Sequence, residues 1–272
     1  MIRAVATDID GTFLRQDRTY DRDLFKKVYE AMEDQGIRFI IASGDQYYFL
    51  RSLFPDQADQ LAYVAENGVL TVDRNEEIAC DRLQPSDVKA VTEYLDSLPG
   101  VNYCASGRQF AYVPESTDEK FKKIIPNFYT RTKNVNRITD VTDDFIFKFA
   151  LNVPHEHQAE ISHDINTRFK GVIRATASGY GAIDLIIPHM DKSYGLKLLL
   201  DRWNVSPDEL AVFGDGENDL EMFDLAGTSY AMGNAPHNVQ SAATEVIGSN
   251  NDQAVLHRLA RLLLNSRFVK LS

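Results

Sequence analysis

Two aspartates directly after a short apolar run at the start of the chain constrain the fold more than any other feature. The run Ile2–Ala6 predicts a buried strand, and Asp8-Ile9-Asp10-Gly11-Thr12 follows it. A buried parallel strand ends at the sheet edge where α/β folds bind ligands, and alternation along the chain points Asp8 and Asp10 the same way. Gly11 permits a tight turn whose backbone N–H groups can face an anion. Because two converging carboxylates repel each other, we predict a cation between them, and Mg²⁺ suits an all-oxygen site.

A second acidic cluster lies in the C-terminal part of the chain in a similar setting. Leu210–Phe213 predicts another buried strand, and Gly214-Asp215-Gly216-Glu217-Asn218-Asp219 follows it. Either cluster alone is also typical of a solvated turn, because Asp, Asn and Gly favour loops for conformational reasons. Two such clusters, each at the end of an apolar strand, favour a shared site in which Asp215 lies beside the first pair.

Two further segments fit phosphate chemistry. Residues 37–42 predict a third strand that ends at Ser43-Gly44, where a hydroxyl and a backbone N–H can hold a phosphate oxygen. Lys192 begins an amphipathic helix and can neutralise the charge of a phosphate and a nucleophile together. The apolar face of this helix consists of Leu196, Leu199, Leu200 and Trp203. Taken alone, Ser43 is typical of a capping residue and Lys192 of a surface charge, so the argument rests on their combination with the acidic clusters.

In order and spacing these segments resemble the haloacid dehalogenase superfamily, in particular its Cof-like phosphatases with a type IIB cap. The resemblance covers nearly the whole chain and includes Glu66-Asn67-Gly68, which follows the fourth apolar segment. This chain departs from the family pattern at two positions. Asp45 stands where the family often has Arg, and Ser193 stands where it often has Gly. Asp45 places a negative charge near the predicted phosphate site and so bears on the choice of substrate.

The resemblance implies a Mg²⁺-dependent phosphomonoester hydrolase that acts on small phosphorylated metabolites, either sugar phosphates or cofactor phosphates. Asp8 would attack phosphorus to form an aspartyl-phosphate, and Asp10 would protonate the leaving group and then deprotonate the water. Lys192 is the third catalytic residue. The predicted metal site comprises Asp8, the backbone carbonyl of Asp10, and Asp215, with Asp219 in support. The predicted substrate-binding residues are Gly11, Ser43, Gly44, Asn67 and Asn218.

Two alternatives use the same residues. A phosphomutase on the same scaffold would return the phosphoryl group to the substrate, and nothing in the sequence distinguishes it from a hydrolase. A non-catalytic phospho-accepting signalling protein would combine acidic residues, a hydroxyl and a lysine on a similar sheet. The second carboxylate, Asp10, favours turnover over signalling.

The order of predicted elements indicates a doubly wound, Rossmann-like α/β core interrupted by an insertion. Strands and helices alternate in residues 1–83 and again in residues 188–272, as in a parallel sheet. Residues 84–187 mix strand pairs with helices, which predicts an α+β cap. Its last strand pair is a hairpin predicted around Gly179 and Gly181.

Composition limits the partners. The formal net charge is −11, which argues against nucleic acid or an anionic membrane surface as a partner. Two cysteines without metal-ligand spacing provide no disulfide framework, and no apolar run approaches the about 20 residues of a membrane span. The N-terminus enters a strand at once, so we expect a cytoplasmic protein. The sequence leaves the oligomeric state open.

Overall fold

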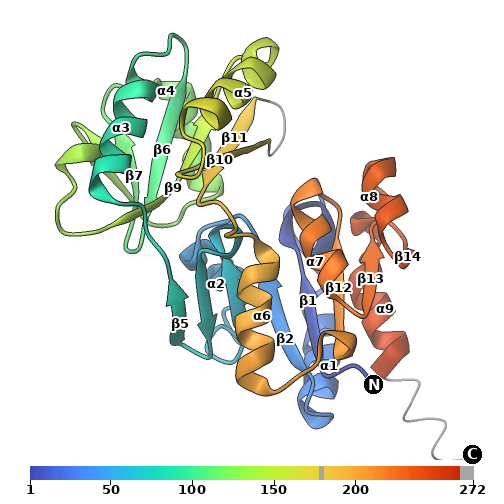
Figure 1. Ribbon diagram of the computed structural model, residues 1–272. Helices are drawn as coiled ribbons and strands as arrows, with labels where there is room; N and C mark the ends of the chain where they lie inside the picture. The colour runs from blue at the N-terminus through green and yellow to red at the C-terminus, as the bar shows by residue number, and fades with distance from the viewer. Residues whose placement is uncertain (178–180, 264–272) are drawn as a thin grey trace, which may run out of the picture. The chain divides into compact units, whose positions relative to one another are not determined.

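The computed structural model describes residues 1–177 and 181–263, and contacts divide the chain into two units, each built from separate segments (Figure 1). The first unit comprises Met1–Gly44, Asp56–Ile78 and the residues from Asp191 onward. The second comprises Asp45–Pro55 and Ala79–Met190. The predicted insertion, residues 84–187, falls within the second unit, which also takes in Asp45–Pro55, a segment that we expected in the core.

Several contacts group Asp45–Pro55 with the second unit, among them the stacking of Arg131 on Tyr48 and a pair of hydrogen bonds at the start of the segment. The Gln46 side chain donates through Nε2 to the Arg131 carbonyl and accepts from the Arg131 N–H through Oε1, both at 3.0 Å. A side-chain amide that pairs in both directions with one backbone residue holds the segment as a strand neighbour would. Helix α2 (Tyr47–Leu53) follows directly and is counted with the second unit.

Eight strands of the described residues form the sheet of the first unit, and most of its strands run parallel (Figure 1). In spatial order they are β14 (Glu245–Val246), β13 (Thr228–Ala231), β12 (Leu210–Gly214), β1 (Ala4–Thr7), β2 (Arg38–Ala42), β3 (Ala62–Ala65), β4 (Leu70–Asp73) and β5 (Glu76–Cys80). All pairs from β14 to β3 are parallel, and β4 runs antiparallel to β3. β1 and β12 are neighbours in the sheet, but both segments of the second unit lie between them in the sequence. This arrangement confirms the doubly wound core with an insertion.

Helices cover both faces of this sheet, because alternate strand residues point to opposite sides. Ala4 and Ala6 of β1 belong to one apolar cluster with α6 (Lys192–Trp203), α7 (Leu220–Leu225) and α8 (His237–Ala242). On the other face α1 (Arg22–Asp34) packs against α9 (Ala254–Leu263). Aromatic rings near α1, including the edge-to-face pair of Phe13 and Phe25, fill that side.

The second unit is an α+β domain around a six-stranded sheet of the described residues. In spatial order its strands are β10 (Arg174–Ala177), β11 (Ala182–Ile186), β9 (Ile146–Asn152), β6 (Asn102–Gly107), β7 (Ala111–Pro114) and β8 (Thr132–Val135). Helices α3 (Pro85–Asp96) and α5 (Gln158–Arg168) pack on one face, and α4 (Glu119–Ile124) and the residues after it pack on the other. β8 escaped prediction because its largely exposed, polar residues lack an apolar pattern. Gly179, around which we predicted a hairpin turn, lies outside the described residues.

In the parts of the chain that the structure describes, no helix has the length and apolar character required to span a bilayer.

Candidate active site

The parallel register of three strands brings the sequence motifs to one edge of the first sheet. Thr7, the last residue of β1, pairs with Phe213 of β12 and with Ile41 of β2. The Asp8 N–H continues the ladder by donating to the Phe213 carbonyl at 2.9 Å. Asp8, Asp215 and Ser43 therefore all leave the sheet at its carboxyl edge.

Three carboxylates meet at this edge. One oxygen each from Asp8, Asp215 and Asp219 lies within 4.8 Å of the others. Thr12 Oγ1 donates to Asp215 Oδ1 at 2.7 Å, which orients that carboxylate. Asp219 Oδ2 accepts from the backbone N–H groups of Asp215 and Gly216 at 2.8 and 2.9 Å. One oxygen of Asp219 is therefore occupied by backbone N–H groups of its own loop. Asp8 and Asp215 carry the oxygens best placed to receive a cation.

Lys192 lies between two of these carboxylates and is buried. Its Nζ donates to Asp8 Oδ1 and to Asp219 Oδ1, each at 2.6 Å, and its side chain has no exposed surface. Burial by itself lowers the pKa of Lys192, but the two carboxylates outweigh it and raise the pKa above its ordinary value. The lysine therefore stays charged and neutralises part of the acidic cluster.

One buried lysine does not balance three carboxylates. Burial raises the pKa of Asp8, and Asp219 and Asp215 add to this effect while Lys192 opposes it. Burial also raises the pKa of Asp215 to about 6, against the hydrogen bond from Thr12. Three carboxylates beside one buried lysine leave an excess of negative charge at this edge of the sheet. A set of carboxylate oxygens with such an excess fits Mg²⁺, which prefers oxygen ligands.

The loop after β1 requires a glycine at position 11. Gly11 has φ +78°, and a Cβ built there would lie 2.2 Å from Asp215 Oδ2. A side chain would therefore be strained and would displace the carboxylate. The turn η1 (Ile9–Phe13) lets the backbone pass directly beside Asp215, as the sequence motif predicts.

The structure also brings the predicted Ser43, Gly44 and Asn67 together. The Asn67 N–H donates to the Ser43 carbonyl at 3.1 Å, and a Cβ on Gly44 would lie 3.0 Å from Asn67 Oδ1. Asn67 belongs to a turn in which Glu66, Asn67 and Gly68 all have positive φ. A Cβ on Gly68 would lie 2.0 Å from the carbonyl oxygen of Asp191, so this turn packs directly against the start of α6.

Two predicted side chains stand apart from the acidic cluster. The Asp10 carboxylate is 45% exposed and pairs with Arg18 at 3.7 Å, so it lies outside the cluster in which we expected it to converge with Asp8. Asn218 is partly exposed, and its side chain lies against Gly216. A Cβ built on Gly216 would lie 2.5 Å from Asn218 Oδ1. Ser193, one of the two departures from the family pattern, donates to Asp191 Oδ1 at 2.7 Å and so reinforces the start of α6.

Three side-chain amides that hold the loop after β1 were not predicted. Asn234 Nδ2 donates to the Gly11 carbonyl at 2.8 Å, and Asn250 Nδ2 donates to the Leu14 carbonyl at 2.7 Å. Gln253 Nε2 donates to the Phe13 carbonyl at 3.2 Å. Asn234 lies in the loop after β13, and Asn250 and Gln253 lie at the start and just past the end of a short 3-10 helix after β14. No pattern in one sequence separates them from other loop residues.

Comparison with known proteins agrees with this geometry. A family model described as haloacid dehalogenase-like hydrolase matches residues 5–259. A 5-amino-6-(5-phospho-D-ribitylamino)uracil phosphatase of Escherichia coli, YbjI, is 38% identical over 262 residues, which cover 96% of each chain. A phosphatase of the same name from Bacillus subtilis, YitU, is 25% identical, covering 92% of this chain and 94% of its own.

Solved structures show the same architecture. The protein SMU.1108c of Streptococcus mutans superposes with a TM-score of 0.91 at 34% identity, covering 97% of this chain and 100% of its own. The HAD subclass IIB sugar phosphatase BT4131 shares the fold with a TM-score of 0.80 at 20% identity, covering 96% and 98%. With its acidic cluster, buried lysine and interrupted core, the chain belongs to the haloacid dehalogenase-like hydrolases and is a phosphatase of that family.

Proposed function

We propose that this protein is a Mg²⁺-dependent phosphomonoester hydrolase that works through an aspartyl-phosphate on Asp8. The observation that carries the proposal is the position of the Asp8 carboxylate, buried at the sheet edge between Lys192 and Asp215. A buried carboxylate with a raised pKa is basic enough to act as a nucleophile. The charge on Lys192 opposes the rise in the pKa of Asp8 and so favours its ionised form.

The chemistry divides into two displacements. In the first, an Asp8 oxygen bonds to phosphorus while the bond from phosphorus to the leaving oxygen breaks, and Asp10 gives its proton to that oxygen. In the second, Asp10 takes a proton from water, the water oxygen bonds to phosphorus, and the bond to Asp8 breaks. Inorganic phosphate leaves, and both aspartates return to their initial states.

The remaining residues bind the phosphoryl group and hold the site. The Ser43 hydroxyl and the Gly11 and Gly44 N–H groups are donors for phosphate oxygens at the sheet edge. Asp8, the Asp10 carbonyl and Asp215 would hold Mg²⁺, which supplies Lewis-acid stabilisation of phosphate charge when bound. Asp219 would orient Lys192 and the loop that carries Asp215.

For the substrate we propose a cofactor-type phosphate, with 5-amino-6-(5-phospho-D-ribitylamino)uracil as the first candidate. The support is the name shared by the relatives from Escherichia coli and Bacillus subtilis, which cover nearly the whole chain. The phosphate of that compound sits on a sugar-alcohol carbon, so its leaving group is an alkoxide. An alkoxide leaves slowly without a proton, which gives Asp10 a defined task.

The test is phosphate release from this compound and from a panel of sugar phosphates, with Mg²⁺ and with EDTA. Wild type is compared with Asp8→Asn and with Asp23→Asn, a matched change on the exposed surface of α1. We expect Mg²⁺-dependent turnover in wild type and Asp23→Asn and none in Asp8→Asn, with unchanged far-UV circular dichroism. Turnover that survives Asp8→Asn would overturn the assignment of the nucleophile.

The panel also tests the alternative functions of the site. Faster hydrolysis of a sugar phosphate would overturn the substrate proposal but not the chemistry. A stable phosphoenzyme without turnover would support phospho-accepting signalling, and a requirement for a bisphosphate activator would support a mutase.

A further inference from the structure

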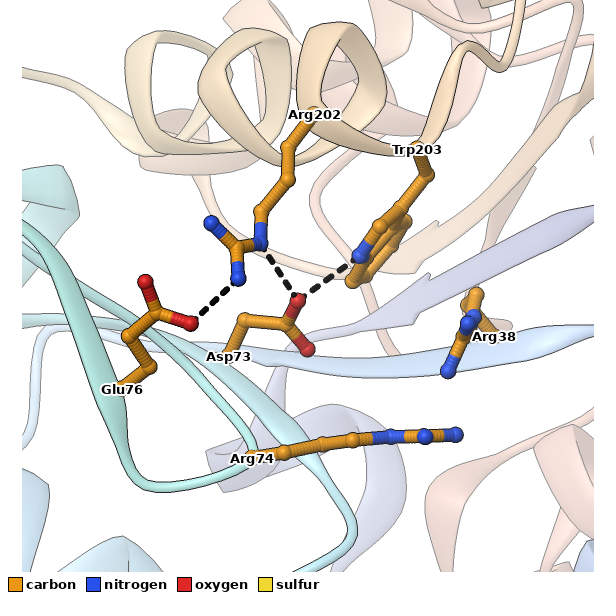
Figure 2. Close-up of a pocket in the computed structure, with 6 residues that line it drawn as sticks. All are labelled: Arg38, Asp73, Arg74, Glu76, Arg202 and Trp203. Carbon is orange, nitrogen blue, oxygen red and sulfur yellow. Dashed lines mark hydrogen bonds and ion pairs between the residues drawn. The ribbon is translucent and has the colours of Figure 1, made fainter.

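The first unit carries a second pocket at the opposite edge of its sheet. It has a volume of about 480 Å³ and is lined by Arg38, Asp73, Arg74, Glu76, Arg202 and Trp203 (Figure 2). Arg38 is the first residue of β2, whereas Ser43 follows the last. Asp73 pairs with Ala62, the first residue of β3. The pocket therefore lies at the amino edge of the parallel strands, away from the catalytic carboxylates.

The acidic side of this pocket is already satisfied. Arg202 Nε donates to Asp73 Oδ2 at 2.9 Å, and Arg202 Nη2 donates to Glu76 (Figure 2). Trp203 Nε1 donates to the same Asp73 oxygen at 2.9 Å. Arg202, the two carboxylates and the indole N–H thus form one closed hydrogen-bonded set, in which the guanidinium balances one of the two carboxylate charges. These acids are engaged with Arg202 rather than with the other two arginines.

The basic side has no such closed set. Arg38 lies with its guanidinium carbon 5.5 Å from the centre of the Trp203 ring, and among the described residues it makes no ion pair with a carboxylate. Arg74 is 48% exposed, and its contact with Glu33 is long, at 4.0 Å. The charge of Glu33 also helps to raise the pKa of Tyr29.

The guanidinium groups of Arg38 and Arg74 both lower the pKa of the same hydroxyl, that of Tyr29. Burial raises the pKa of Tyr29 to about 12, and both Arg74 and Arg38 oppose this rise, so both cations lie within electrostatic reach of one hydroxyl. Figure 2 shows their side chains on the side of the pocket that faces away from Arg202. Two cations gathered in this way in a chain of net charge −11 favour a bound anion.

We propose that this pocket binds a phosphate group, either free phosphate or that of a small organic phosphate, through Arg38 and Arg74. Guanidinium groups match the oxygen spacing of phosphate and carry a permanent charge. The volume exceeds the needs of inorganic phosphate alone and lies within the usual range of small-molecule sites, so the organic part of a monoester fits beside Trp203. The site is separate from the catalytic one and does not depend on the proposed reaction.

Trp203 makes the proposal directly testable, because it is the single tryptophan of the chain. We would titrate inorganic phosphate, and in a second arm ribose 5-phosphate, into the Asp8→Asn protein at constant ionic strength without Mg²⁺. Tryptophan fluorescence and isothermal titration calorimetry are recorded together, since substitution of Arg38 itself alters the surroundings of the indole. We expect a saturable change in both signals with a dissociation constant of about 1 mM or below.

Four variants in the Asp8→Asn background distinguish phosphate bound in this pocket from phosphate bound at the catalytic edge or elsewhere on the surface. Arg38→Gln and Arg74→Gln should each raise the dissociation constant about tenfold, as expected for loss of a charge-assisted contact. Arg261→Gln, a matched change on the exposed surface of α9, should leave it unchanged. Ser43→Ala at the catalytic edge should leave the dissociation constant read from Trp203 fluorescence unchanged, because Trp203 lines the pocket at the opposite edge.

The proposal fails if neither ligand gives a saturable signal. It also fails if Arg38→Gln and Arg74→Gln bind as tightly as their parent while retaining its circular dichroism spectrum. A fluorescence change that disappears in Ser43→Ala would place the bound phosphate at the catalytic edge and equally overturn the proposal. Tighter binding of ribose 5-phosphate than of inorganic phosphate would support the organic ligand, and equal affinity would support recognition of the phosphate group alone.

Discussion

Replacement of Lys192 by methionine tests the charge balance on which the site depends. Methionine keeps the length of an apolar chain but removes two charge-assisted hydrogen bonds of 2.6 Å, to Asp8 and to Asp219. The two carboxylates that lose their partner are 10% and 1% exposed, so water replaces little of the lost interaction. Removing one partner of a buried ion pair costs about 3–5 kcal/mol. We therefore expect Lys192→Met to lower the free energy of unfolding by about that amount in Mg²⁺-free buffer at neutral pH.

The assay is urea unfolding followed by the fluorescence of Trp203, which lies in the same helix. Lys197→Met is the matched control, because Lys197 is an exposed lysine of α6, and we expect a change of about 0.5 kcal/mol or less. Adding Asp219→Asn to Lys192→Met should recover part of the loss, since it removes one of the uncompensated charges. If Lys192→Met unfolds at the same urea concentration as Lys197→Met, the inferred charge balance is wrong.

Two further substitutions test the tight turn at Gly11 and the raised pKa of Tyr94. Gly11→Ala should weaken Mg²⁺ binding measured by calorimetry and lower stability by more than Gly36→Ala, because only the first adds a Cβ 2.2 Å from Asp215 Oδ2. Both glycines have positive φ, and a side chain in that backbone conformation costs about 1–2 kcal/mol at either position. Nothing lies within 4 Å of a Cβ at Gly36, so the two substitutions differ only in the contact with Asp215. Equal effects would contradict the steric argument. Burial and the hydrogen bond to Asp164 raise the pKa of Tyr94 to about 12. The folded state therefore holds this proton more tightly than the unfolded state, and stability is lost as pH rises from about 10 toward 12. Tyr94→Phe should show a smaller loss over that range in urea unfolding, and an identical pH dependence would refute this.

The core of the fold and much of the site follow from patterns that one sequence displays. Strands β1, β2 and β12 are short apolar runs, and each ends in a polar motif. In a parallel sheet such ends must meet at one edge, so Asp8, Ser43 and Asp215 were expected together although they are far apart in the chain. Lys192 was predicted as the first residue of a helix, where its apolar face fixes the direction of the side chain.

Other features have no local signature. Asp45–Pro55 follows a core motif, and long-range contacts group it with the second unit, such as those of Gln46 with the Arg131 backbone and of Tyr48 with Arg108. The amides of Asn234, Asn250 and Gln253 bind carbonyls of the loop after β1, more than 200 residues earlier in the sequence. Such contacts depend on how loops meet after the sheet has formed, and loop residues carry no periodic pattern.

Helix α6 combines a local sequence pattern with long-range contacts that the sequence does not reveal. Its apolar face predicted the helix, but Trp203 on that face also donates to Asp73, and Arg202 beside it binds Asp73 and Glu76 (Figure 2). Arg202 is 39% exposed, so these pairs contribute little to stability. Their effect is positional, because they attach the last turn of the helix to the connection between β4 and β5 while Lys192 is attached to Asp8 and Asp219 at the first turn. A 12-residue helix of about 18 Å held at both ends cannot slide along its axis, so the amino group of Lys192 stays between Asp8 and Asp219.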